Sequence, residues 1–164
     1  MKIARRDLLR RGWKLGGSLL GVAAGWTVFE SLRPLATGAA KPKIKVGSLT
    51  DFADGTSTYV PAGRLFITNA GGQLFALSQK CPHLGCRVPF CESSGRFECA
   101  CHGSIFDLGG EWIAGPAPRG MDRLALAVDG TSLQADTGAV TEGPPHGAKE
   151  FLTPPRGPSC LEKG

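Results

Sequence analysis

The apolar positions of this chain form one long run near the N-terminus and many short runs after it. Residues 15–29 contain no charged side chain, and widening the window to residues 13–32 adds only two charges, both near its ends. Twenty residues of helix span about 30 Å, the thickness of the hydrocarbon core of a bilayer. The pattern therefore predicts one transmembrane anchor over residues 15–32, preceded by a basic leader over residues 1–14.

Charge on either side of this run predicts its orientation. Basic residues precede the run and Glu30 lies near its other end, so the positive-inside rule indicates a cytoplasmic N-terminus. Arg5-Arg6 followed by Asp-Leu-Leu-Arg resembles a twin-arginine export signal, although basic residues that only set topology explain it nearly as well. A cleaved signal peptide is the alternative, but a good small-residue cleavage site is missing. We expect an uncleaved anchor in the cytoplasmic membrane and a head on its extracytoplasmic side.

The rest of the chain alternates short apolar runs with turn residues. Residues 33–46 mix prolines with small residues and read as an exposed hinge linker. Beyond them, turn pairs such as Gly71-Gly72 and Asp129-Gly130 separate the apolar runs, which predicts an all-β antiparallel fold. These runs lie at residues 65–67, 74–77, 97–98 and 124–128. Prolines accumulate after residue 136 without a clear strand pattern, so residues 137–164 are expected to form an extended surface tail.

Composition and charge agree with this division. The chain of 164 residues has 24 Gly and 12 Pro, as expected for short elements joined by many turns. Its net charge of +5 comes entirely from residues 1–40, because residues 41–164 contain twelve basic and twelve acidic side chains. A head without net charge argues against nucleic acid as a partner.

Most of the chemically reactive side chains fall in two short segments, Cys81-Pro82-His83-Leu84-Gly85-Cys86 and Cys99-Ala100-Cys101-His102-Gly103-Ser104. They contain four of the six cysteines and two of the three histidines. Three interpretations are open. Two cysteines and two histidines could hold a structural zinc ion, a thiol could be a nucleophile with histidine as its base, or two thiolates and two imidazoles could hold a [2Fe–2S] cluster.

The spacing C-x-H-x-G-C followed by C-x-C-H-G-S resembles the Rieske iron–sulfur family, over about residues 44–136. The resemblance implies a fold of three antiparallel sheets, in a Rieske domain over residues 47–136 with a small cluster-binding subdomain over about residues 79–119. By position, it implies a disulfide between Cys86 and Cys101. It also implies that the inner iron is held by thiolates and the outer iron by imidazoles, the four ligands being Cys81, Cys99, His83 and His102.

Other positions match family features around the cluster. Ser104 matches a serine that hydrogen-bonds a bridging sulfide, and Gly115-Pro116 begins a segment similar to the proline loop that covers the cluster. Phe106 stands where high-potential members have a tyrosine, which implies a lower reduction potential and favours menaquinol as the donor. Cys91 and Cys160 remain as an even pair, which suggests a second disulfide. His146 is expected to be a solvated surface residue.

The resemblance implies an electron carrier that acts only as a subunit of a larger enzyme, a quinol:cytochrome c oxidoreductase. Quinol would meet the imidazole of His83 or His102, which would accept its proton while the cluster takes one electron. The partners implied are a cytochrome b-type membrane subunit and a c-type cytochrome or other periplasmic acceptor. Two alternatives remain: the Rieske small subunit of a molybdenum oxidoreductase such as arsenite oxidase, and a structural zinc-binding module.

Overall fold

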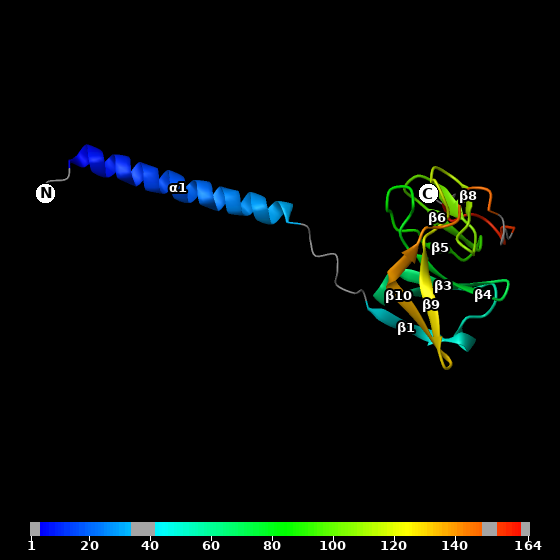
Figure 1. The fold of residues 1–164 in the computed structure, drawn as a ribbon. Helices are drawn as coiled ribbons and strands as arrows, with labels where there is room; N and C mark the ends of the chain where they lie inside the picture. The colour runs from blue at the N-terminus through cyan, green and yellow to red at the C-terminus, as the bar shows by residue number, and fades with distance from the viewer. Residues whose placement is uncertain (1–3, 34–41, 149–153, 162–164) are drawn as a thin grey trace. The chain divides into compact units, whose positions relative to one another are not determined.

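The computed structural model describes residues 4–33, 42–148 and 154–161. The chain divides into two compact units, an N-terminal unit up to Ala39 and a second unit from Ala40 onward. The first contains the single helix α1 (Arg5–Leu32), and the second is built from β-strands, with two one-turn 3-10 helices at Leu49–Asp51 and Pro61–Gly63 (Figure 1). We call the second unit the head.

Helix α1 is long and apolar enough to cross a membrane. Its 28 residues correspond to about 42 Å at the usual helical rise, and none of its side chains is buried in the structure. The hydroxyl groups of Ser18, Thr27 and Ser31 donate to backbone carbonyls three or four residues earlier. These polar groups are thus satisfied inside the helix, as a hydrocarbon environment requires.

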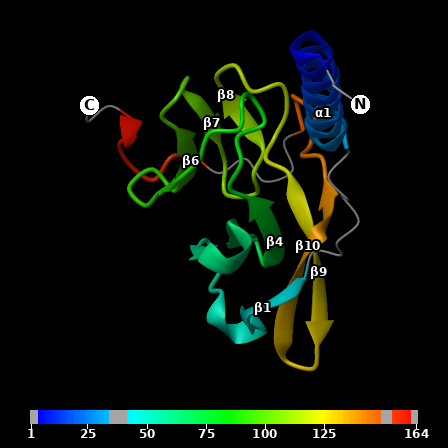
Figure 2. The same ribbon diagram turned by 90° about the vertical axis from the view of Figure 1, so that its left-hand side faces the viewer.

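The head contains two antiparallel sheets. The larger sheet has six strands, whose bounds are β1 (Lys43–Ser48), β2 (Ser57–Val60), β3 (Leu65–Ala70), β4 (Gln73–Ser78), β9 (Arg123–Asp129) and β10 (Ser132–Thr141), in the order β1-β10-β9-β4-β3-β2. The smaller sheet has four strands in sequence order, β5 (Phe90–Cys91), β6 (Arg96–Cys99), β7 (Ser104–Phe106) and β8 (Trp112–Ala114). Strands β6, β7 and β8 lie together at one end of the head (Figure 2).

The three expected sheets correspond to these strands, with two of them joined. Only two residue pairs connect β4 to β9, so the larger sheet divides there into β1-β10-β9 and β4-β3-β2. Strand β3 carries apolar side chains on both faces. Leu65 and Ile67 enter one core with Leu133, whereas Phe66 enters the other core with Phe97. Such alternation is expected for a strand buried on both faces, and the predicted all-β fold is confirmed.

Two segments differ from the expectation. Residues 43–46, expected in the linker, begin β1, where Lys43, Ile44 and Lys45 pair with β10. Lys43-Ile44-Lys45-Val46 alternates charged and apolar residues, as an edge strand does, but the run is short and directly follows the proline-containing linker. Strand β10 continues to Thr141, beyond the expected start of the tail. A register shift near residues 137–139 interrupts the alternating pattern of the strand, and the sequence therefore predicts the end of the strand too early. Residues 34–41 of the linker, and residues 149–153 and 162–164 of the tail, lie outside the described residues.

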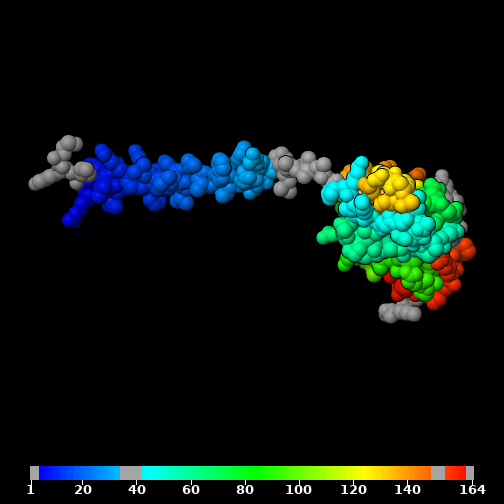
Figure 3. Space-filling model, turned by 90° about the horizontal axis from the view of Figure 1, so that it is seen from below, coloured from blue at the N-terminus to red at the C-terminus, as the bar shows by residue number. Residues whose placement is uncertain are grey.

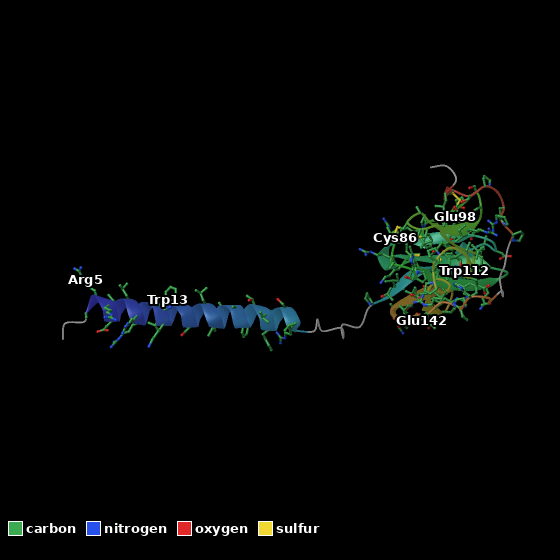
Figure 4. All side chains as sticks on the ribbon, turned by 90° about the horizontal axis from the view of Figure 1, so that it is seen from above. Arg5, Trp13, Cys86, Glu98, Trp112 and Glu142 are labelled. Atoms are coloured by element: carbon green, nitrogen blue, oxygen red, sulfur yellow. A yellow bond between two sulfur atoms is a disulfide. The ribbon has the colours of Figure 1, made fainter. Side chains whose placement is uncertain are left out.

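Glu98 fixes the end of the tail to the smaller sheet of the head. Its buried carboxylate accepts hydrogen bonds from the hydroxyls of Ser94 and Ser159, at 2.6 and 2.8 Å, and from the amides of Cys160 and Leu161. Burial alone would raise the pKa of Glu98, but these four bonds outweigh it and lower the pKa below its usual value. The tail therefore packs on β6 through a charged group, Glu98 (Figure 4). In Figure 3 the red C-terminal residues lie against the green part of the head.

A disulfide joins the same two regions. Cys91 in β5 is bonded to Cys160, 69 residues later, and the bond lies beside Glu98 (Figure 4). Closing a loop of that length stabilises the folded state by roughly 4 kcal/mol in the chain-entropy model. The described end of the tail, residues 154–161, is thus held both covalently and by the Glu98 carboxylate.

A second buried carboxyl group closes the turn between β7 and β8. Asp107 is fully buried; its Oδ1 accepts a bond from the Glu111 amide at 2.8 Å, and its own amide donates to the Glu111 carbonyl. Its Oδ2 has no hydrogen-bond partner among the described residues. Burial raises the pKa of Asp107 from its usual 3.8 to about 6, and the nearby Glu111 carboxylate adds to this rise.

This raised pKa predicts the pH dependence of stability. The folded state disfavours the charged form of Asp107, so this group destabilises the protein as the pH rises from about 4 through about 6. Asp107→Asn has no ionisable group at this position and does not lose stability in this way. The free energy of unfolding of the variant relative to the wild type should therefore increase by up to about 3 kcal/mol between pH 4 and pH 7. Thermal unfolding of the protein as purified, across this pH range, measures the difference. Asp54→Asn, at an exposed position, controls for the charge change, and parallel profiles for Asp107→Asn and the wild type would contradict the prediction.

Candidate metal centre

The two cysteine–histidine segments form loops of the same construction. In the first loop the amide of Gly85 donates to the carbonyl of Cys81 at 2.9 Å, and in the second the amide of Gly103 donates to the carbonyl of Cys99 at 3.0 Å. Both glycines have a positive φ, of 80° and 75°, a conformation that glycine adopts without the steric cost of a side chain. The same spacing of Cys and Gly therefore gives the same turn twice.

Each loop is closed at its base by strand pairing. An isolated bridge pairs Lys80 with Arg87 around the first loop, and the β6–β7 ladder pairs Cys99 with Ser104 around the second. The Cys86–Cys101 disulfide joins the two loops directly. The sulfur of Cys86 is visible at the edge of the head (Figure 4). The two loops thus form one cross-linked unit.

Two thiols and two imidazoles remain available in this unit. Cys81 and Cys99 are buried and are not in disulfides, whereas the His102 side chain is exposed and His83 is half-buried. The two imidazole rings meet edge to face, with 4.8 Å between their centroids. Burial raises the pKa of the Cys81 thiol, and the neighbouring Cys99 thiol adds to the rise, so a bound cation is needed to hold the Cys81 sulfur as a thiolate.

The environment of the His83 imidazole indicates that a ligand binds at this site. Its Nδ1 is buried and has no hydrogen-bond partner among the described residues, which is costly unless a metal or another group binds it. Thiolates and imidazoles are the donors that iron–sulfur and zinc sites use. The donor set therefore fits a metal centre with two sulfur and two nitrogen ligands.

The spacing of the donors favours two metal atoms over one. Ligands of a tetrahedral zinc ion lie less than about 4 Å from one another, given metal–ligand bonds of about 2.0–2.3 Å. Among the described residues, the groups of three or more Cys, His, Asp or Glu donors that come within 4.8 Å are Cys86-Cys99-Cys101 and Cys91-Glu98-Cys160. Both groups are built on disulfides. The four available donors do not converge on one point.

Comparison with known proteins identifies the centre. A family model described as the Rieske [2Fe–2S] domain matches residues 43–128, more than half of the chain. The chain belongs to the Rieske [2Fe–2S] family. Its cofactor is accordingly a Rieske-type [2Fe–2S] cluster, as the two loops suggest.

Individual relatives of this Rieske protein agree with the family. The cytochrome b6-f complex iron–sulfur subunit of Chlorobaculum thiosulfatiphilum is 31% identical over 135 residues, which are 77% of this chain and 75% of the relative. The corresponding subunit of Synechococcus sp. (strain JA-3-3Ab) is 35% identical over 100 residues, 61% of this chain and 53% of the relative. The solved structure of a plasma membrane Rieske protein from Synechocystis PCC 6803 is 28% identical, covering 56% of this chain and 97% of that one, with a TM-score of 0.44.

Residues singled out around the cluster loops lie next to them in this Rieske protein. Ser104 is fully buried, and its Oγ accepts a hydrogen bond from the Ala117 amide at 3.2 Å. Phe106 is fully buried in the same core as Cys81 and Cys99. Gly115 has a φ of 88°, and a Cβ there would come within 2.5 Å of the Ser104 Cα. The loop that begins at Gly115 therefore packs directly on the second cluster loop.

Three residues near the cluster loops have an exposure or contacts that the sequence alone does not reveal. Leu84 lies between His83 and Gly85 and has 70% of its surface exposed. Its signal in the sequence was a leucine inside a turn segment of Cys, His and Gly residues. Trp112 precedes the Gly115 loop, and its indole donates to the Gly115 carbonyl at 3.0 Å. His146 is exposed as expected, but its ring stacks on Trp112 and bonds the Ala117 carbonyl; only the scarcity of histidine could have drawn attention to it.

Iron content tests which residues bind the cluster and which cysteines only form disulfides. Cys81→Ser and His83→Ala are each expected to abolish the cluster, because each removes one of the two thiols or two imidazoles available as metal donors. Cys91→Ser combined with Cys160→Ser is the matched control, since it removes two sulfurs of the same head without touching the four donors. Iron analysis and the visible absorption spectrum measure the result. Full iron content in Cys81→Ser, or its loss in the control, would contradict this division.

Proposed function

We propose that this chain is the one-electron carrier of a membrane-bound quinol-oxidising complex of the cytochrome bc or b6-f type. Cys81 and Cys99 hold the inner iron of its cluster, and His83 and His102 hold the outer iron. The observation that carries the proposal is the burial gradient across the site, since both free thiols are buried while the imidazoles lie toward solvent. The ligand side that can exchange protons thus faces possible substrates.

The loop tip supplies the contacts that a quinol reaction needs. The cluster, when bound, supplies a one-electron acceptor. The imidazoles of His83 and His102 accept a hydrogen bond from a quinol hydroxyl and take up its proton. Leu84 beside them offers an exposed apolar side chain, which suits docking against the apolar quinol site of a cytochrome b-type subunit.

The relatives support the choice of complex. Curated relatives at 31% identity are named cytochrome b6-f complex iron–sulfur subunits, and helix α1 is suited to a place in such a membrane assembly. Gly17, Gly21 and Gly25 share one face of α1, which allows close approach of a neighbouring membrane helix. The electron leaves toward a c-type cytochrome or another periplasmic acceptor.

Disulfide bonding and charge support the proposed location. Four of the six cysteines of this chain are in disulfides, and these bonds persist in oxidising compartments outside the cytoplasm. Basic residues gather before the apolar run, including Arg5, Arg6 and Arg10, which favours retention of the N-terminus in the cytoplasm. The chain is thus a single-pass protein of the cytoplasmic membrane with an extracytoplasmic head. The part of the predicted linker that precedes β1, residues 33–42, would serve as the hinge by which the head moves between partners.

The identity of residue 106 favours a low-potential donor. Phe106 packs in the core that contains the two thiols but has no hydroxyl to donate to a ligand sulfur. Hydrogen bonds to the sulfurs stabilise the reduced cluster and raise its potential. The lack of one such bond suits menaquinol better than ubiquinol.

Introducing a hydroxyl group at position 106 tests this inference. Phe106→Tyr is expected to raise the midpoint potential, because the new O–H donates to a ligand sulfur. One hydrogen bond of 1–1.5 kcal/mol corresponds to roughly 40–60 mV for a one-electron couple. An EPR-monitored redox titration measures the shift, with Phe90→Tyr on β5, which β6 separates from β7, as the control. An unchanged potential in a Phe106→Tyr protein with a full cluster would refute the assignment.

The complex itself tests the function. Affinity purification of the full chain from native membranes in mild detergent should recover haem b and quinol oxidation activity, with menaquinol preferred over ubiquinol. Recovery of molybdenum without haem b would instead indicate the small subunit of a molybdenum oxidoreductase. A colourless protein with one zinc per chain would indicate a structural module, and either result overturns the proposal.

A matched pair of variants separates quinol docking from cluster assembly. Leu84→Asp places a charge at the exposed tip and is expected to reduce quinol-dependent turnover of the complex at least tenfold, about 1.4 kcal/mol, while leaving the reduced EPR signal intact. Leu49→Asp is the control, because Leu49 is also exposed but lies in the first 3-10 helix, remote from the cluster loops. Equal turnover in the two variants would rule out docking through Leu84.

A further inference from the structure

We propose that His146 and Trp112, which lie outside the two cluster loops, position the Ser104 hydroxyl at the cluster. The C-terminal segment would thereby take part in setting the reduction potential. The inference rests on the presence of the [2Fe–2S] cluster and not on the proposed quinol donor or acceptor. Its test can therefore fail while the proposed function stands.

The aromatic rings of Trp112 and His146 stack on each other and bond the loop that begins at Gly115; we call this ring pair the clip. The indole of Trp112 and the imidazole of His146 stack with 3.9 Å between centroids and 20° between planes. Each ring also bonds this loop: Trp112 Nε1 donates to the Gly115 carbonyl at 3.0 Å, and His146 Nε2 donates to the Ala117 carbonyl at 2.7 Å. Since a carbonyl only accepts, Nε2 of His146 carries a hydrogen in this arrangement.

A short chain of hydrogen bonds leads from the clip to the cluster loop. The carbonyl of Ala117 is held by His146, and the amide of the same residue donates to Ser104 Oγ at 3.2 Å. Ala117 and Ser104 are both fully buried. Ser104 follows the second cluster loop directly, two residues after His102. Displacing Ala117 therefore displaces the partner of a hydroxyl group beside the cluster.

The bond from Ala117 decides where the Ser104 hydrogen points. One lone pair of Oγ is occupied by the Ala117 amide, which among the described residues is its hydrogen-bond partner. The hydroxyl hydrogen is buried away from water and needs an acceptor. A sulfur of the cluster is the group in this site able to accept it, and such a bond stabilises the more negative, reduced form.

The tail backbone holds His146 against this loop. The amide of Gly120 donates to the Pro144 carbonyl at 2.8 Å, and the amide of Gly143 donates to Asp122 Oδ1 at 3.1 Å. Gly143 packs so closely that a Cβ there would clash with the Gly120 backbone. An isolated strand bridge pairs Arg119 with Pro145. The position of the imidazole is thus fixed from its own side of the stack as well.

The experiment is an EPR-monitored redox titration of single and double variants at one neutral pH. His146→Ala is expected to lower the equilibrium constant for cluster reduction roughly two- to tenfold, the effect of one weakened hydrogen bond. Ser104→Ala is expected to lower it at least as much. The double variant Ser104→Ala with His146→Ala should match Ser104→Ala alone, because the two side chains act through the same bond.

Two gentler variants and one control complete the design. His146→Gln keeps an N–H donor and should recover part of the shift, and Trp112→Phe keeps the ring stack and should cause a smaller shift than His146→Ala. Glu142→Gln changes an exposed charge in the same tail and should leave the potential unchanged. Amide hydrogen exchange should become faster at Ala117 in His146→Ala, a readout that does not depend on turnover.

Two results would overturn the proposal. The first is an unchanged potential in His146→Ala and Trp112→Phe together with a shifted potential in Ser104→Ala. The second is additive shifts in the double variant, which would mean that His146 acts on the cluster independently of Ser104. If His146→Ala does not retain the cluster, His146→Gln and its double variant with Ser104→Ala decide between the same outcomes.

Discussion

The structure depends on holding two separate loops side by side, so that their two free thiols and two imidazoles lie in one site. Neither loop could do this alone, because each supplies one free thiol and one imidazole. The same glycine-closed turn appears in both, with Gly85 bonded to Cys81 and Gly103 bonded to Cys99. The Cys86–Cys101 disulfide then fixes the distance between them. Strands β5 to β8 serve as the rigid support from which these loops extend.

Burial in the head follows from this requirement. Cys81 and Cys99 belong to the same core as Phe97 and Phe106, so the thiol side of the site is dry. The opposite side carries the imidazoles and the exposed Leu84. A site that is apolar at one end and open at the other can retain a cofactor while still reaching a partner. Strand β3 makes this possible, because it faces the cluster core with Phe66 and the second core with Leu65 and Ile67.

Much of this arrangement could be predicted because the decisive information is local. The spacing of Cys, His and Gly within each loop specifies a turn, and short apolar runs between glycine pairs specify strands. The register shift in β10 obscured one strand boundary, since the pattern there departs from simple alternation. The start of β1 was missed because its alternating run, Lys43-Ile44-Lys45-Val46, is short and directly follows the proline-containing linker. Apart from the Cys91–Cys160 disulfide, which the even pair of cysteines suggested, the contacts of the tail were beyond prediction for another reason. The stacking of His146 on Trp112 and the four bonds to Glu98 join residues far apart in sequence, and nothing in either segment specifies its partner.

The cysteines of this head exist in two chemical states, and this has a consequence for its biogenesis. Two remain available as metal ligands while four are oxidised in pairs. Oxidation of an empty head would expose Cys81 and Cys99 to exchange with Cys86 and Cys101, which lie in the same loops. If the cofactor enters while the thiols are reduced and cross-linking follows, the bound metal protects its two ligands from this exchange. The cofactor would act, in this sequence, as the template that determines which sulfurs are left to pair.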